Sequence, residues 1–508
     1  MALMTGPLPT TPAATPLAPS QQLWRNPWFT NLFVAELWER VGFYGIQAIL
    51  VLYAVAPTDN GGMGLSSGSA AALFGAYLGV TFMLALPGGW IADRVLGQQR
   101  ALVVGLAFIA AGCLSLAVSG PVFAIIGLLC IACGFGLFKP NHQALINMLA
   151  GPAGRREATI AAFFVGIQGT ALVAPLVIGF LGERVSWRVG FATLGIVVGI
   201  GVVTTARGLR SYGRAGAGPA RPLAPSQGRR VARRVGLLVA AVVVLVVVGL
   251  IGGFLNPQIA LMVVGLTLIS APWGAYVKLR RDPGLTADDR WRLSIMLRLV
   301  LAATIFWLLA GQDGSVLTLF AKDSTDRTVL GFTFPASWLQ AATPLFMLVL
   351  APLFAWQLPR LGARYSVPMK FAFALVVVAV SFLVMAVAAG AAADGTKVSP
   401  LWLLAVYLMH ACAEIVIAAV SISSMADLVP SAYLGQGLGL YWLFAALGGG
   451  LASQVSALVD VLPGPVYFVS LAVVALAVAA AFVAGRRGLA APFATARGAG
   501  EPADGTPY

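Results

Sequence analysis

Charged residues are scarce in this sequence. Asp, Glu, Lys and Arg make up only 10% of the 508 residues, whereas a soluble domain carries about a quarter. Apolar residues make up 59%, which is more than a water-soluble core can hide. The composition therefore excludes an ordinary soluble protein and predicts an integral membrane protein with the lipid bilayer as its solvent.

Histidine and cysteine are also few, with two and four residues respectively. The only close cysteine pair, Cys130 and Cys133, has no second pair or histidine pair to complete a zinc site. HExxH motifs, carboxylate–histidine clusters and phosphate-cradling loops are absent as well. We therefore expect no metal and no cofactor, and the enzyme class is disfavoured.

The net charge of +14 does not indicate nucleic-acid binding, because the basic residues lie in short segments between apolar runs. If the N-terminus is inside, 25 of the 32 Lys and Arg residues fall in inside segments, five fall outside and two lie within spans. The positive-inside rule then predicts a multi-pass protein of the cell (inner) membrane with both termini in the cytoplasm.

Apolar runs of membrane-spanning length fall into a six, two, six pattern. The runs cover residues 29–55, 68–92, 99–118, 121–149, 157–181 and 187–205, then 235–254 and 258–277, then 292–320, 333–358, 367–391, 399–428, 433–459 and 464–484. The pattern predicts an all-α membrane protein of about 14 helices. Two six-helix bundles with two extra central helices match the plan of the major facilitator superfamily fold.

The expected organisation follows from these runs and the polar stretches between them. We predict a disordered cytoplasmic tail at 1–27, an N-terminal bundle at 28–206, a cytoplasmic linker at 207–234, a two-helix insertion at 235–278, a second linker at 279–291, a C-terminal bundle at 292–485 and a disordered cytoplasmic tail at 486–508. We have no role to assign to the insertion beyond a scaffold between the bundles.

A loop between the second and third spans resembles the cytoplasmic signature of that superfamily. Its residues are Gly89, Asp93, Arg94, Gly97 and Arg100. The glycines allow a tight turn and a close approach of helices. We expect Asp93 to accept hydrogen bonds that help close the cytoplasmic side, so these five residues form a predicted gate motif.

Charges within spans are costly and mark functional sites. Glu36, Glu39 and Arg40 share one face of the first span, where Glu36 can pair with Arg40. Lys139, in the fourth span, is the natural partner for the surplus acid. A carboxylate that alternates between pairing and protonation carries protons, so these four residues are the predicted proton-coupling group.

Several motifs together resemble the proton-dependent oligopeptide transporter family. The segment from Glu36 to Gly45 is similar to its E-x-x-E-R-F-x-Y-Y signature, and Gly134–Asn141 is similar to its motif around a coupling lysine. Phe306-Trp307, Gly331–Ser337 and Ala413-Glu414-Ile415 resemble later family motifs in the family order. The resemblance implies proton coupling at Glu36, Glu39, Arg40 and Lys139, and capture of a peptide's amino end by Glu414.

The substrate-binding positions carried over from the family are partly altered. They are Tyr44, Gln47, Phe82, Lys139, Gln168, Phe306, Thr343, Glu414 and Tyr441. Relative to the family, Gln47 replaces an arginine and Gly311 replaces an acid, so the salt bridge of the outer gate is lost. We therefore expect outer closure to rely on apolar packing, with Phe43 and Phe306 as candidates.

Three further residues have alternative interpretations. Asp313 either serves the transport path or caps the outer end of the seventh span. His142, on the face of Lys139, and His410, one turn before Glu414, are either proton relays or packed imidazoles. The packed role is the favoured one, so neither histidine is among the predicted site residues.

The predicted function is a proton-coupled symporter that imports di- and tripeptides or peptide-like molecules, with protons as the coupling ion. Its expected partners are that substrate and the bilayer, with no nucleic acid and no obligatory protein partner. The alternative within the same fold is a proton-coupled exporter of drugs or small metabolites. A nutrient sensor is disfavoured because the tails are too short for an output domain.

Overall fold

In the computed structural model, the described residues are 23–150, 153–220, 222–223, 226, 230, 233, 257–430 and 433–498. The expected span at 235–254 and most of the expected tail at 1–27 lie outside them. The first half contains α2 (Pro27–Val55), α3 (Ser67–Met83), α4 (Ala85–Ile91), α5 (Gln98–Leu116), α6 (Pro121–Leu149), α7 (Ala153–Phe180) and α8 (Trp187–Gly208).

One central helix, α10 (Pro257–Arg280), precedes the second half. That half contains α11 (Ala287–Ala310), α12 (Val316–Asp323), α13 (Ala342–Arg364), α14 (Val367–Ala391), α15 (Leu401–Leu428), α16 (Leu434–Ser456), α17 (Gly464–Ala484) and α18 (Arg486–Gly498). A two-residue antiparallel hairpin, β1 (Thr328–Val329) and β2 (Phe332–Thr333), pairs Thr328 with Thr333 and Val329 with Phe332.

Local signals explain where these helices begin. Proline occupies the first turn of α2, α6, α14 and α17, where its missing N–H costs nothing. Thr286 and Asp289 form a reciprocal capping box at the start of α11. Asp282 accepts bonds from the Gly284 N–H and the Tyr433 hydroxyl, which lower the pKa of its carboxyl and tie the α10–α11 turn to the start of α16.

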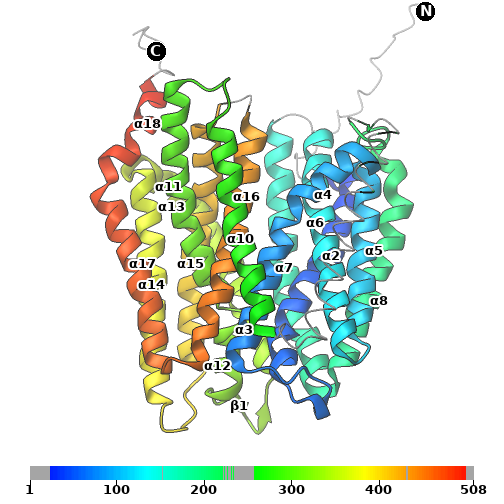
Figure 1. Cartoon of the computed structure of the whole chain (residues 1–508), viewed down its shortest axis with the longest axis vertical. Coiled ribbons are helices and arrows are strands. Elements are labelled where there is room, and N and C mark those ends of the chain that lie inside the picture. The colour runs from blue at the N-terminus through cyan, green and yellow to red at the C-terminus, as the bar shows by residue number, and fades with distance from the viewer. Residues whose placement is uncertain are drawn as a thin grey trace, which may run out of the picture.

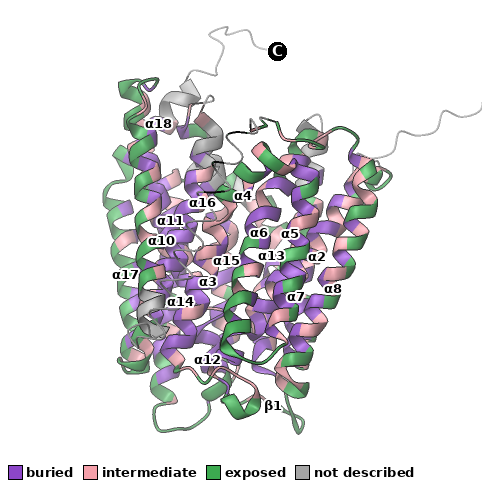
Figure 2. Ribbon diagram, turned by 45° about the vertical axis from the view of Figure 1, so that its right-hand side comes forward, coloured by how far each residue is buried: buried purple, intermediate pink, exposed green. Residues whose placement is uncertain are grey.

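Eleven helical segments among the described residues are long and apolar enough to cross a membrane. Figure 2 shows exposed residues along the outward side of α17, and they are apolar: Val466, Val469, Val473 and Val474. An apolar surface of this kind suits lipid. The helix α2, with its three charged side chains, is not among the eleven, but it runs alongside them (Figure 1). The chain is a multi-pass membrane protein with the expected all-α fold.

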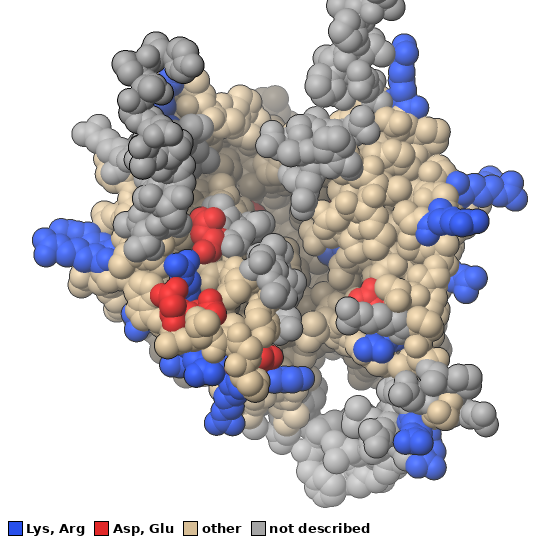
Figure 3. All heavy atoms as spheres, turned by 90° about the horizontal axis from the view of Figure 1, so that it is seen from above, with Lys and Arg blue, Asp and Glu red and all other residues tan. Residues whose placement is uncertain are grey.

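The two halves stand side by side, with α10 between them (Figure 1). This helix contacts α3 of the first half and α16 of the second half. The first and last described residues lie at one end of the molecule, here called the open end, and the β1–β2 hairpin lies at the other, here called the closed end (Figure 1). Seen from the open end, the molecule is hollowed between the halves (Figure 3).

Polar contacts join the halves at the closed end. The Glu183 carboxylate accepts hydrogen bonds from the Ala336 and Ser337 N–H groups at 2.8 and 2.9 Å. The Asp460 carboxylate accepts from Ser66 Oγ at 2.5 Å and from the Gly68 N–H at 2.8 Å. The expectation that apolar packing alone closes this side is therefore wrong.

The two candidates for that apolar gate lie elsewhere. Phe43 is buried in the first half against Phe135, and Phe306 is buried in the second half against Trp307. Neither has a ring contact across the halves among the described residues. The closing donors are backbone N–H groups and uncharged side chains such as those of Ser66 and Ser337, which explains why a search for oppositely charged side chains does not find them.

The expected span at 292–320 is interrupted. The helix α11 ends at Ala310, and α12 begins at Val316. Glycines at 311 and 314 weaken the helix here. The Gln312 side chain replaces the lost backbone pairing, because it donates to the Leu308 carbonyl and accepts from the Tyr467 hydroxyl. Phe74 of α3 fills the space above Gly314.

The segment expected to be a disordered tail after residue 485 begins with the helix α18, so that expectation is wrong for residues 486–498. Leu489 and Phe493 lie one turn apart and pack against the core of the second half. The helical spacing of these two apolar residues is the sequence pattern that could have predicted α18.

Tight packing between α3 and α16 yields a stability prediction. A Cβ atom added at Gly75 would lie 2.6 Å from the backbone nitrogen of Ser453, so Gly75→Ala must push two backbones apart. We expect a loss of about 1–3 kcal/mol, seen as a lower thermal unfolding midpoint in detergent. At Gly199, where no atom lies within 4 Å, Ala should be neutral or stabilising. Equal midpoints for Gly75→Ala and the unmutated protein would contradict this contact.

Candidate functional site

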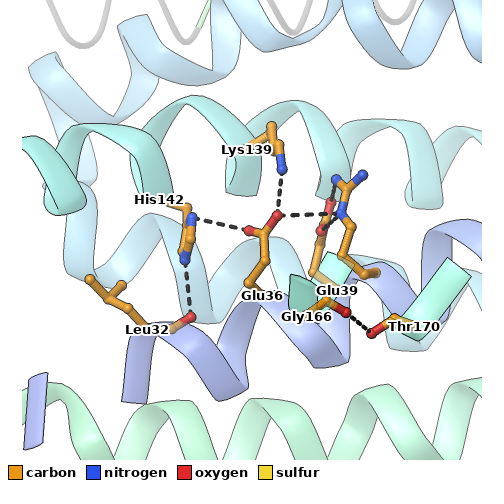
Figure 4. Close-up of polar contacts among 8 residues, drawn as sticks. Leu32, Glu36, Glu39, Lys139, His142, Gly166 and Thr170 are labelled. Carbon is orange, nitrogen blue, oxygen red and sulfur yellow. Dashed lines mark hydrogen bonds and ion pairs between the residues drawn. The ribbon is translucent and has the colours of Figure 1, made fainter. Parts of the chain in front are cut away.

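A buried group of charges lies where α2 crosses α6. Glu36, Glu39 and Arg40 of α2 are 1%, 0% and 8% exposed. Their spacing turns all three toward α6, which carries Lys139 and His142. Figure 4 shows the side chains of Glu36, Glu39, Lys139 and His142 converging between the two helices, and Arg40 pairs with both glutamates.

Glu36 is the centre of this group. Its Oε1 lies 2.5 Å from Lys139 Nζ and 3.5 Å from Arg40 Nε. Its Oε2 lies 3.0 Å from His142 Nδ1. The expected contact between Glu36 and Lys139 is present, and three cationic or protonatable groups surround one carboxylate.

Arg40 pairs mainly with its neighbour Glu39. Two hydrogen bonds of 2.5 Å, from Nε and Nη2, reach the two carboxylate oxygens of Glu39. The guanidinium also lies 4.7 Å from the centre of the Phe43 ring. The helix spacing suggested Glu36 as the partner of Arg40, but the bidentate pair with Glu39 is the closer one, and Glu36 remains available to α6.

His142 faces two hydrogen-bond acceptors. Its Nδ1 contacts the Glu36 carboxylate, and its Nε2 lies 3.0 Å from the Leu32 carbonyl oxygen. A neutral imidazole can donate from only one nitrogen. This arrangement therefore suits a doubly protonated His142, a cation that the sequence analysis left outside the predicted site. Its position three residues after Lys139 was the available signal.

Lys139 is the least covered member of the group. Its side chain is 28% exposed, against 2% for Glu36 and for His142. When His142 carries a second proton, Glu36 has a cationic partner besides Lys139. The ammonium of Lys139 is then free to pair with another anion.

Glu414 of α15 belongs to the other half. It is half-buried, and among the described residues it has no hydrogen bond or ion pair. The Tyr44 hydroxyl on α2 interacts electrostatically with both Arg40 and Glu414. Tyr44 therefore interacts both with the charged group of the first half and with the Glu414 carboxylate of the second.

Other predicted binding residues form contacts within and between the two halves. The Phe82 and Trp442 rings stack 6.0 Å apart, across the two halves. Gln168 of α7 donates to the Met347 sulfur of α13 at 2.8 Å, and Trp307 Nε1 lies 3.4 Å from the Tyr441 hydroxyl. These contacts bring aromatic and amide groups from both halves together.

Three predicted binding positions are less engaged. Gln47 is half-buried, without a hydrogen bond among the described residues. The Thr343 hydroxyl is buried and lacks a partner within that same set. Phe306 is only 1% exposed and packs inside the second half, so the structure does not place it on a substrate surface.

The predicted gate motif forms the turn between α4 and α5. Gly97 has a φ of 78°, which favours glycine. Asp93 accepts a bond of 2.6 Å from Gln98, and Arg94 lies beside it in the same turn. Gly89 and Arg100 flank this turn. At the open end, Asp93 thus pairs within its own loop rather than across the halves.

A second buried histidine lies in the other half. His410 Nδ1 is 2.7 Å from Asp313 Oδ1, and its Nε2 is 2.8 Å from Ser381 Oγ. Asp313 is therefore more than the polar cap that the sequence favoured. Among the described residues, no group of three or more His, Cys, Asp or Glu side chains has the arrangement of a metal site.

Comparison with known proteins agrees with this architecture. Residues 99–469 match the family model described as "POT family". "Peptide transporter YePEPT" of Yersinia enterocolitica is 34% identical over 440 residues, which cover 82% of this chain and 85% of the relative. "Uncharacterized transporter YclF" of Bacillus subtilis is 30% identical over 451 residues, which cover 88% and 90%.

Solved structures are similar over almost the whole chain. A peptide transporter POT in complex with sulfate has a TM-score of 0.86 and 29% identity, and covers 93% of this chain and 99% of its own. A mutant POT peptide transporter in complex with alafosfalin has a TM-score of 0.85 at 30% identity, with the same coverage. The family model covers more than half of the chain, the relatives and solved structures are similar over most of it, and this chain belongs to the POT family.

Proposed function

We propose that this protein is a proton-coupled symporter that imports di- and tripeptides or peptide-like small molecules by alternating access. The observation that carries the proposal is the buried Glu36–Lys139–His142 contact in one half, together with Glu414 of the other half, which has no hydrogen bond or ion pair among the described residues. The family consists of transporters rather than enzymes, and its members named above include peptide transporters.

The charge arrangement suits a zwitterion. Lys139 is the most accessible cation of the first half, and Glu414 is an acid without a partner among the described residues of the second. A short peptide would place its carboxylate toward Lys139 and its ammonium toward Glu414. The exporter alternative is less well supported, because an apolar drug would leave both charges unpaired.

Proton coupling follows from competition for Lys139. A proton on His142 or on a nearby carboxylate balances charge within the group and releases Lys139 toward the substrate carboxylate. Loss of that proton draws Lys139 back to Glu36. Substrate binding and protonation therefore favour the same state of the cluster, which is the requirement for symport.

A conformation that is closed at one end and open at the other corresponds to one state of the transport cycle. Contacts of Glu183 and Asp460 join the halves at one end, and the hollow opens at the other. The excess of Lys and Arg in segments at the open end supports a cytoplasmic location for that end and for both termini. The conformation is then the inward-facing one.

Altered binding positions point to a modified substrate range. Relative to the family pattern, Phe43 and Phe82 replace tyrosines, and Thr343 replaces an asparagine. These changes remove groups that would bond a peptide backbone. Affinity should therefore depend more on the substrate's two charged ends and its bulk, which is why peptide-like molecules are included.

The first functional prediction concerns the driving force. In liposomes with an inward proton gradient, uptake of dialanine or a peptide-like substrate should stop when a protonophore is added. Lys139→Ala, Glu36→Gln and Glu39→Gln should abolish gradient-driven uptake while counterflow survives, because the halves can still rock without exchanging a proton. Lys397→Ala, at an exposed loop position, should behave like the unmutated protein. Full gradient-driven uptake by Lys139→Ala would refute the coupling role.

The second functional prediction concerns the ammonium site. Acetylation of a substrate's amino group should weaken its competition by roughly 10- to 150-fold, which corresponds to a charged contact of about 1.5–3 kcal/mol. Glu414→Gln should remove most of the difference between free and acetylated forms, whereas Asp394→Asn, in an exposed loop, should preserve it. Equal competition by both forms against the unmutated protein would exclude Glu414 as the ammonium site.

A further inference from the structure

The second half contains a buried chain of hydrogen bonds that the proposed coupling group does not use. His410 of α15 is 2% exposed and Ser381 of α14 is 0% exposed. Asp313, in the turn after α11, has a side chain that is 23% exposed. His410 joins the other two, with contacts of 2.7 Å to Asp313 and 2.8 Å to Ser381.

The hydrogens of this chain can be counted. Ser381 Oγ lies 2.7 Å from the Val378 carbonyl oxygen, which can only accept. A serine hydroxyl has one hydrogen, so while that hydrogen is donated to Val378, Oγ must accept from the N–H at His410 Nε2. An ionised Asp313 can also only accept, so Nδ1 must donate to it. With every contact satisfied, both ring nitrogens carry hydrogen and His410 is a cation.

The same chain accommodates the neutral imidazole. After one proton is lost, the remaining hydrogen stays on Nδ1 toward Asp313, and the Ser381 hydroxyl turns from Val378 to donate to Nε2. Val378 loses only a side-chain contact. Asp313, with its partly exposed carboxylate, is the end of the chain that water can reach. The site is thus satisfied with and without the extra proton.

The charged surroundings of His410 are few. Glu414 lies one turn farther along α15 and interacts electrostatically with both Asp313 and His410. The tyrosines that interact with these acids are Tyr407, near Asp313, and Tyr441 of α16 and Tyr44 of α2, near Glu414.

Among the described residues, no other charged group on the neighbouring helices lies near the hydrogen bonds that join Asp313, His410 and Ser381. Lys370 of α14 precedes Ser381 by about 16 Å along the helix. Arg298 is the last charged residue of α11 and precedes Asp313 by 15 positions, Arg360 lies near the end of α13, and Arg486 and Arg487 begin α18.

We propose that His410, held by Asp313 and Ser381, is a second proton-binding site of this transporter, located in the half that receives the substrate's ammonium group. Protonated His410 balances Asp313 and leaves Glu414 as the single excess negative charge. When the Nε2 proton is lost to water, Asp313 and Glu414 are two carboxylates without a balancing cation on His410, and an ammonium group is attracted more strongly. Proton release here therefore favours binding of the cationic end. This inference rests on the proposed function for its role, but not for the existence of the site.

Nuclear magnetic resonance can test the site directly, because the chain has only two histidines. The protein is prepared with a histidine-free affinity tag and ¹⁵N-labelled imidazoles in lipid nanodiscs, and its ring-nitrogen signals are followed between about pH 5 and 9. The His410 signals are assigned as those absent from His410→Gln. We expect His410 to be doubly protonated at the acidic end and to lose one proton within this range.

Variants distinguish a His410 that binds a proton from a His410 that only packs in the core. Asp313→Asn should cause His410 to lose its proton at lower pH, because the cation loses its balancing carboxylate. Ser381→Ala should act in the same direction, more weakly. Cys412→Ala, a neutral change on the same helix, should leave the titration unchanged. A His410 that stays neutral over the whole range in the unmutated protein would overturn the proposal, and this result does not depend on any variant folding.

Transport measurements test the role. The proton-to-substrate ratio is obtained from the substrate gradient that balances an imposed proton gradient. By linkage, a proton that is released when the substrate binds moves opposite to the substrate, so His410→Gln should raise this ratio by about one, whereas Cys412→Ala should not change it. An unchanged ratio in a folded His410→Gln would overturn the coupling role. A titrating His410 in a protein without any proton-driven uptake would instead refute the proposed function and leave the proton site in place.

Discussion

The burial of Glu36 is the constraint on which the transport core depends. A carboxylate 1% exposed and at membrane depth must be balanced by a cation or by a proton. Lys139 and His142 of α6 both reach it. Because balance can come from a fixed charge or from a mobile proton, the position of Lys139 becomes tied to protonation. Under the proposed coupling mechanism, the same buried acid holds α2 against α6 and makes that contact responsive to the proton gradient.

Each half balances a carboxylate with a buried histidine, and the two arrangements are similar. In each, a buried histidine presents Nδ1 to a carboxylate and Nε2 to an oxygen: Glu36 and a carbonyl for His142, Asp313 and a hydroxyl for His410. The difference lies in the oxygen partner. A carbonyl can only accept, so His142 is held as a donor, whereas a hydroxyl can reverse its role. The second half therefore has the more permissive arrangement for losing a proton.

Much of the architecture was predictable because lipid imposes simple rules. Apolar runs gave the helices, and the spacing of Glu36, Glu39 and Arg40 indicated their shared face. The break after Ala310 was missed because its polar groups are satisfied by Tyr467, distant in sequence. The contact between Asp313 and His410 was missed for the same reason: it joins residues 97 positions apart. The closing contacts of Glu183 use two backbone N–H groups and the Ser337 hydroxyl, so no oppositely charged residue signals them.

The position of α10 has a mechanical consequence. Its Leu268 side chain lies beside Gly79 of α3 and Gly450 of α16, and so touches one glycine from each half. When two rigid bodies rotate against each other, only points near the rotation axis keep their neighbours. A helix that stays in contact with both halves throughout a cycle must lie close to that axis. The central helix would then act as a fulcrum, and the bulk of Leu268 would set how far apart the halves stand while they turn.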